Sequence, residues 1–325
     1  MRLAVAALAT ALAAQPVLAV PNNVHLHKRL RTQMLKPPPV VKPPVLIYYG
    51  GAVIPSVKIV AIFWGPKVDS TTTSQVGAFY ADFVVGPMFD WLKEYNTPKQ
   101  QIGHGSFASA VTITPKAQGT TVTDVQIQAE IKAQLAAHKL PAADGNTLYM
   151  IHFPKGMVIK QGKQISCKDF CAYHGTVDLK TFYGVVPDQN TGTGCDLGCG
   201  SNGAFGNLTV SASHEIVEAV TDAQVGLVKG NNLSAPLAWY DSTHDATGHQ
   251  YGEIGDICAA YATTFKGASG KTWNVQKEWS NKSQGCIADP GDKPQAVAAS
   301  SGGAAGKAAG KKVVPVKARV KKKKG

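Results

Sequence analysis

Three short continuous apolar runs along the chain are typical of buried strands. They occupy residues 57–64, 148–153 and 182–186, and each is rich in β-branched or aromatic residues. Gly65 and Pro66 close the first run, as turn residues often do at the end of a strand. The sequence therefore predicts at least three strands with little polar surface.

Between these runs, apolar residues recur at helical spacing. The pattern predicts helices over 76–95 and 122–140, with Thr123 or Asp124 as the N-cap of the second helix and Pro141 beyond its end. Strands mixed with helices favour an α/β or α+β fold. We expect a central sheet with flanking helices, built as a single large disulfide-stapled domain.

The two ends of the chain differ from its body in composition. Arg2 and the apolar run that follows it, ending in small residues up to Ala19, predict a signal peptide over 1–19. Residues 20–44 are basic and rich in proline, which predicts a stiff linker or pro-segment. The globular domain is expected over 45–290. Residues 291–325 are rich in alanine, glycine and lysine, which predicts a disordered tail.

The net charge of +12 comes from these ends. Residues 291–325 carry +9, residues 20–43 carry +5 and Arg2 adds one, which leaves −3 on the body of the chain. A mildly acidic body excludes a basic nucleic-acid groove, so no nucleic-acid partner is expected. The basic tail is suited to contact with an anionic cell surface. No segment after the signal peptide is long and apolar enough to predict a transmembrane helix.

Six cysteines in an exported chain predict disulfides. They form the groups Cys167 with Cys171, Cys195 with Cys199, and Cys258 with Cys286. Local pairing within the first two groups leaves Cys258 and Cys286 to join each other. Crossed pairing between the first two groups stays open, as does a four-cysteine zinc site, although zinc motifs more often use tighter spacings. Export to an oxidising compartment favours the disulfides.

The segment 210–222 carries the most informative chemistry. Its apolar spacing predicts a helix, with Ser211 or Ser213 as the cap, on which His214 and Glu218 project from one face one turn apart. This spacing suits two metal ligands. Glu215 stands where a His-Glu-x-x-His helix places its general base. With Glu218 in place of the second histidine, zinc is the expected metal, while calcium and manganese stay open because they also accept oxygen ligands.

A catalytic zinc needs a third protein ligand, and the segment 251–258 offers one. Glu253 and Asp256 are the candidates, next to the cysteine expected to fix their loop. Either Tyr240 or His249 could act as an oxyanion donor. Further candidates for the metal, each more typical of a surface or core residue, are Asp241, His174, His244 and His249.

Several segments along the body match a known family as a set. In chain order they are 48–51, 57–65, 170–175, the pair Cys195 and Cys199, 213–218, 238–240, 253–258 and the tryptophan-containing stretch up to Cys286. On these segments the chain resembles the secreted phosphate-induced family of plants to which EXORDIUM belongs, together with related microbial exported proteins. The resemblance implies an extracellular or cell-wall location and, for the plant members, roles in growth.

Two functions of different classes follow from these features. The first is a secreted metal-dependent hydrolase, similar to a zinc metallopeptidase, that acts on a peptide or cell-wall substrate. The alternative is a non-catalytic extracellular protein of the EXORDIUM type, in which aromatic residues contact a surface partner. Its candidate contact residues are Trp239, Tyr240, Trp273 and Trp279. A serine hydrolase is disfavoured because the chain has no Gly-x-Ser-x-Gly motif.

Overall fold

The computed structural model describes residues 24–28, 43–224, 233–244 and 250–297, with only the backbone described at 24–28 and at His244. The predicted signal peptide over 1–19 lies outside the described residues, as does the tail from residue 298 onward. No helix within the described ranges is long and apolar enough to cross a bilayer.

The described elements are mixed helices and strands. The helices are α1 (Ser70–Phe83), α2 (Pro87–Trp91), α3 (Asp124–Ala136) and α4 (Gly203–Thr221), with 3-10 helices η1 (Leu92–Tyr95), η2 (Cys195–Leu197) and η3 (Asp256–Cys258). The strands are β1 (Val24–Lys28), β2 (Ile47–Tyr48), β3 (Lys58–Phe63), β4 (Ser106–Thr112), β5 (Thr121–Thr123), β6 (Thr147–His152), β7 (Val158–Gln161), β8 (Gln164–Ile165), β9 (Phe170–Thr176), β10 (Phe182–Val186), β11 (Trp239–His244), β12 (Gln250–Gly252), β13 (Ala262–Lys266), β14 (Thr272–Gln276), β15 (Glu278–Ser280) and β16 (Gly285–Ile287).

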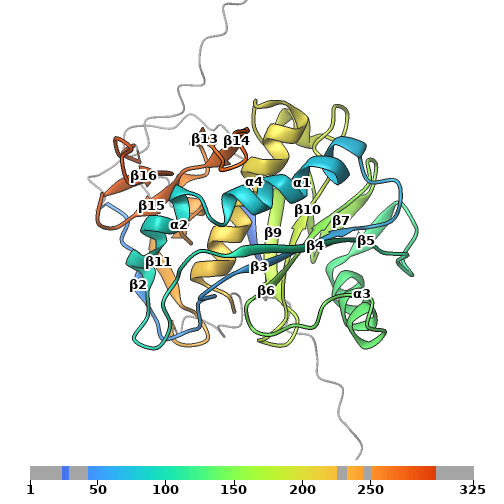
Figure 1. Cartoon of the computed structure of the whole chain (residues 1–325), viewed down its shortest axis with the longest axis horizontal. Coiled ribbons are helices and arrows are strands. Elements are labelled where there is room, and N and C mark those ends of the chain that lie inside the picture. Colours follow the sequence, from blue (N-terminus) through green and yellow to red (C-terminus); the bar gives the residue numbers. More distant parts are fainter. Residues whose placement is uncertain (1–23, 29–42, 225–232, 245–249, 298–325) are drawn as a thin grey trace, which may run out of the picture.

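A six-stranded mixed sheet in the order β1-β9-β10-β6-β3-β4 lies at the centre (Figure 1). Strands β10, β6, β3 and β4 run parallel, whereas β9 is antiparallel to β10, and β1 is antiparallel to β9. The parallel strands β3, β6 and β10 are almost continuously buried, as strands covered on both faces must be.

Two apolar cores cover the two faces of this sheet. Because successive side chains of a strand point to opposite faces, β3 divides its residues between the cores. Val60 and Ile62 pack with Ile127 of α3, whereas Ile59 and Ala61 pack with residues of α1 and α4. The expected α/β architecture, with a central sheet and flanking helices, is confirmed.

The three predicted strands are β3, β6 and β10, but the predicted helix over 76–95 is interrupted. It divides into α1, α2 and η1, and Pro87 stands at the first turn of α2 with Gly86 as its N-cap. Proline has no N–H group for a preceding helix and is tolerated at a first turn, so it begins a new helix here. The second predicted helix is α3. Its N-cap is Thr123, which forms a capping box with Gln126.

The C-terminal strands surround α4 on the side away from the sheet. Helix α4 contacts β14 on one side and β9 and β10 on the other, and every residue from Gly206 to Thr221 is buried. A helix buried on all sides has no solvated face. The polar residues of α4 are therefore held inside the protein.

Both predicted boundaries of the globular domain need correction. Residues 24–28, which we placed in a linker, form the edge strand β1 on the central sheet. At the other end, Gln295 exchanges two backbone hydrogen bonds with Cys286, and Val297 packs against the larger core. Residues 291–297 therefore belong to the folded body. Composition missed these contacts because backbone pairing requires no particular side chain.

Candidate metal centre

Helix α4 holds the first part of the candidate site. His214 and Glu218 lie one turn apart as predicted, with 3.1 Å between His214 Nε2 and Glu218 Oε1. The predicted caps were wrong, because α4 begins at Gly203 with Asn202 as its N-cap. The Ser213 hydroxyl instead donates to the carbonyl of Val210, one turn back within the helix.

Strand β9 brings His174 next to Glu215 and Glu218 of α4. Its Nδ1 lies 3.2 Å from Glu215 Oε2 and 3.6 Å from Glu218 Oε2. Sequence reasoning ranked His174 among the less favoured candidates, although it lies at the centre of the cluster. The sequence did not reveal that β9 pairs with β10 and packs against α4. This packing brings together residues about forty positions apart in the chain. The only sequence signal was that His174 falls within one of the segments that carry the family resemblance.

The loop around η3 supplies the remaining acidic side chains. Glu253 Oε1 lies 3.6 Å from His174 Nε2, and the backbone N–H of Asp256 donates to Glu218 Oε1 at 3.0 Å. The predicted disulfide between Cys258 and Cys286 is present and ties η3 to β16. This loop therefore packs against both α4 and β9 at the cluster.

Two groups of three residues have the spacing needed to hold a metal ion. One contains His214, Glu218 and Asp256, and the other contains His174, Glu218 and Glu253; within each group the donor atoms lie within 4.8 Å of one another. Glu253 and Asp256 were alternatives for a third ligand in the sequence. In the structure they belong to different groups that share Glu218.

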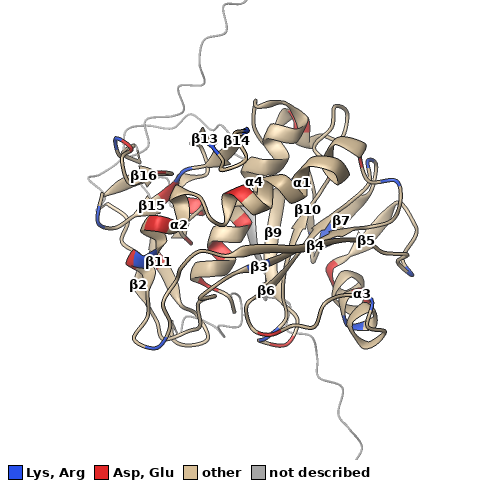
Figure 2. Ribbon diagram, in the orientation of Figure 1, with Lys and Arg blue, Asp and Glu red and all other residues tan. Residues whose placement is uncertain are grey.

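The cluster is almost wholly removed from solvent. His174, His214, Glu215, Glu218 and Glu253 have no exposed surface, and Asp256 is half-buried. Ionised carboxylates are costly to bury unless cations or strong hydrogen-bond donors compensate them. Figure 2 shows this acidic concentration along α4 in the interior, while most lysine and arginine lies at the periphery.

A further buried acid, Glu278 on β15, adjoins the cluster. Burial raises its pKa well above the ordinary value, and the nearby charge of Glu218 raises it further. Gln276 Nε2 donates to Glu278 Oε2 at 3.4 Å and to the carbonyl of Gly255 at 2.8 Å. This amide links Glu278 to the loop of Asp256. Neither residue belongs to a motif in the sequence, because nothing local in the chain connects β14 and β15 with α4.

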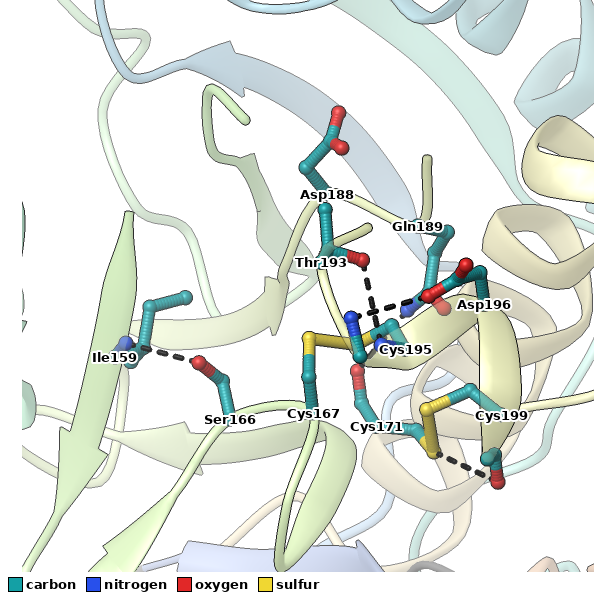
Figure 3. Close-up of a disulfide and its surroundings, with 12 residues drawn as sticks. Ile159, Ser166, Cys167, Cys171, Asp188, Gln189, Thr193, Cys195, Asp196 and Cys199 are labelled. Carbon is teal, nitrogen blue, oxygen red and sulfur yellow. Dashed lines mark hydrogen bonds between the residues drawn. A yellow bond between two sulfur atoms is a disulfide. The ribbon is translucent and has the colours of Figure 1, made fainter. Parts of the chain in front are cut away.

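Two disulfides fasten the segments that lead into the site. They join Cys167 to Cys195 and Cys171 to Cys199, which is the crossed arrangement that the sequence left open (Figure 3). The local pairs considered first are therefore wrong. All six cysteines are bonded, which also removes the four-cysteine zinc site. Cys171 precedes His174 on β9 and Cys199 precedes α4, so this bond holds the two ligand-bearing elements at a fixed separation.

An open cavity of about 280 Å³ lies at the start of α4, and none of the cluster residues is among its lining residues. Its walls include the Cys171–Cys199 disulfide, Val210 and Ala259. Val210 lies one helical turn before His214, and Ala259 follows η3 directly. The three elements that carry the cluster therefore also line this opening.

The other candidate residues have different positions. Asp241 is buried away from the two groups and accepts hydrogen bonds from Val45 N and from the backbone and hydroxyl of Thr243. This pattern explains its burial without a metal. His249 and the side chain of His244 lie outside the described residues. Tyr240 is half-buried on β11.

A scan against protein-family models and searches of curated proteins and solved structures found no match to this chain. The family resemblance therefore stays a prediction from the motifs.

Proposed function

We propose that this protein is a metal-dependent hydrolase of the extracellular space, with His214, Glu218 and Asp256 as metal ligands. The observation that carries the proposal is the convergence of two imidazoles and several carboxylates from three separate elements, at spacings suited to metal coordination. Buried charges are paired, hydrogen-bonded or bound to a metal, and ionisable groups gathered in this way mark a candidate functional site.

Zinc is the proposed metal, because imidazole and carboxylate together form an accepted donor set for it. A bound zinc ion would lower the pKa of a coordinated water to about 7. Glu215 is then suited to accept a proton from that water, since it neighbours both histidines: its two oxygens lie 3.2 Å from His174 Nδ1 and 4.0 Å from His214 Nε2. The proposed reaction is attack of water on a carbonyl carbon.

The cavity at the start of α4 favours a polymeric, uncharged substrate. Glycines, alanines, Ser201 and Asn202 form much of its wall, and none of the described residues that line it is charged. Small side chains on the wall leave room for an extended chain, and the polar groups present can form hydrogen bonds with amides or hydroxyls of a ligand. A peptide or a neutral cell-wall polymer meets both conditions. The three disulfides support folding in an oxidising compartment.

A second candidate function is favoured by one specific observation, the absence of exposed surface on both histidines. A catalytic metal keeps one position open to solvent or substrate, whereas a structural metal is enclosed. In this alternative the ion stabilises a non-catalytic extracellular protein of the EXORDIUM type. Trp273 and Trp279 are core residues, so only Trp239 and Tyr240 of its predicted contact residues have exposed surface.

Metal analysis of two isosteric variants tests the proposal. Glu218→Gln should lose zinc, because a neutral amide oxygen is a weak donor, whereas Glu215→Gln should keep zinc and lose about 10²- to 10⁴-fold in hydrolysis of a fluorogenic peptide library. Glu130→Gln is the matched control. Glu130 is also buried on a helix, but on the opposite face of the sheet, where it accepts from Lys116 N and Gln134.

Three outcomes separate the candidates. Wild-type protein that stays metal-free after zinc reconstitution overturns both. Stoichiometric zinc without hydrolysis by wild type overturns the hydrolase and supports the structural metal. Zinc loss in Glu130→Gln equal to that in Glu218→Gln would show that the effect comes from general destabilisation.

A further inference from the structure

We propose that the cluster holds two divalent cations, bridged by the carboxylate of Glu218. The inference rests on the proposed metal-binding function and adds the number of ions and the assignment of their ligands. In two-metal hydrolytic sites the ions lie about 3.5–4 Å apart and together stabilise the attacking and leaving oxygens.

The two oxygens of Glu218 are directed at different histidines. Oε1 lies 3.1 Å from His214 Nε2, and Oε2 lies 3.6 Å from His174 Nδ1. The histidines approach from α4 and from β9, so one carboxylate lies between two imidazoles from opposite walls. A carboxylate in this position can bridge two ions, with one oxygen for each. On the His174 side, Glu218 Oε2 faces Nδ1 and Glu253 Oε1 faces Nε2 of the same ring. The Asp256 N–H holds Oε1 in place through its 3.0 Å hydrogen bond.

Each side of the bridge has a complete ligand set of its own. Asp256 completes the group of His214, and Glu253 completes the group of His174. Three protein ligands are the usual number for a catalytic zinc, which keeps its fourth position for water or substrate. A single ion would leave one of these groups without a role in metal binding.

Counting ions in isosteric variants of the full chain tests this inference. Wild type reconstituted with zinc should contain two ions per chain. Asp256→Asn and Glu253→Gln should each retain one, because each removes a ligand from one group only, and Glu218→Gln should lose both. With manganese as a probe, wild type should give the EPR spectrum of an exchange-coupled pair, and Asp256→Asn the spectrum of an isolated ion.

The outcomes distinguish this inference from the proposed function. One zinc per chain in wild type, lost completely in both Asp256→Asn and Glu253→Gln, overturns the two-ion centre and leaves the metal-dependent hydrolase intact. Two uncoupled manganese ions overturn the Glu218 bridge. No metal in wild type overturns both proposals, and Glu130→Gln should match wild type throughout.

Discussion

Gly255 packs so closely on His214 that a β-carbon at position 255 would lie 2.6 Å from Nδ1 of the imidazole. The same β-carbon would lie 2.9 Å from Glu218 Oε1. The backbone of the η3 loop therefore forms one wall of the candidate site. Glycine is required here for this close approach, since any side chain would displace a ligand.

Gly255→Ala is accordingly expected to weaken metal binding and to destabilise the protein. Overpacking of a closed interior costs about 1–3 kcal/mol, and movement of either ligand should lower zinc affinity by a larger factor than stability alone would produce. Zinc titration and chemical denaturation measure the two effects. Gly103→Ala is the control, because a β-carbon there would meet only the carbonyl of Pro55, at 3.9 Å. Unchanged zinc affinity in Gly255→Ala would contradict the close packing.

The buried His152 is expected to make the folded protein less stable in acid. It is fully buried on β6 with its Nε2 2.9 Å from the Tyr80 hydroxyl, and burial lowers its pKa from 6.5 to about 3. The unfolded chain therefore takes up the proton first as the pH falls. The free energy of unfolding should decrease from about pH 6.5 toward pH 3, by up to about 1.4 kcal/mol per pH unit from this group.

Urea denaturation at several pH values can isolate the contribution of His152. His152→Gln should reduce the slope between pH 6.5 and 3, whereas His138→Asn, at an exposed position with φ of 53°, should leave it unchanged. Equal slopes in wild type and His152→Gln would show that other groups account for the acid sensitivity.

The crossed disulfides predict a specific peptide map. Digestion without reduction should give one linked species containing Cys167 with Cys195 and Cys171 with Cys199, and a separate one containing Cys258 with Cys286. The double variant Cys171→Ala/Cys199→Ala should lose about 2 kcal/mol of stability, the low end of the usual range, because the Cys167–Cys195 bond still closes most of the same loop. Its zinc affinity should also fall, since β9 and α4 are no longer tied. Recovery of a Cys167–Cys171 link would contradict the structure.

Truncation at two positions tests the corrected C-terminal boundary. Removal of residues 298–325 should leave the Tm unchanged, because their composition offers little apolar surface to bury. Removal of 291–325 should lower the Tm by several degrees, because it also removes the Gln295 pairing with Cys286 and the ion pair of Asp292 with Lys277. Thermal melting compares the two, and a large drop on the shorter truncation would show that the tail packs on the body.

The sequence by itself determined those features that depend on neighbouring residues. The apolar runs of β3, β6 and β10 indicated buried strands, and the spacing of His214 and Glu218 placed both on one face of a helix. Both depend on local periodicity, which is a property of the backbone geometry. The capping box of α3 is equally local. The disulfide between Cys258 and Cys286 was predicted because these two cysteines remained after the other four were grouped.

Only the tertiary structure decided how distant segments combine. It placed His174 opposite Glu218 and assigned Glu253 and Asp256 to different groups. It also paired the first four cysteines between the two sequence groups rather than within them. None of these follows from periodicity, because strand order and the path of a loop arise from burying two faces of a sheet and all sides of α4 at once. A shared carboxylate between two histidines forms only when β9, α4 and η3 pack together, and no local pattern in the chain encodes that packing.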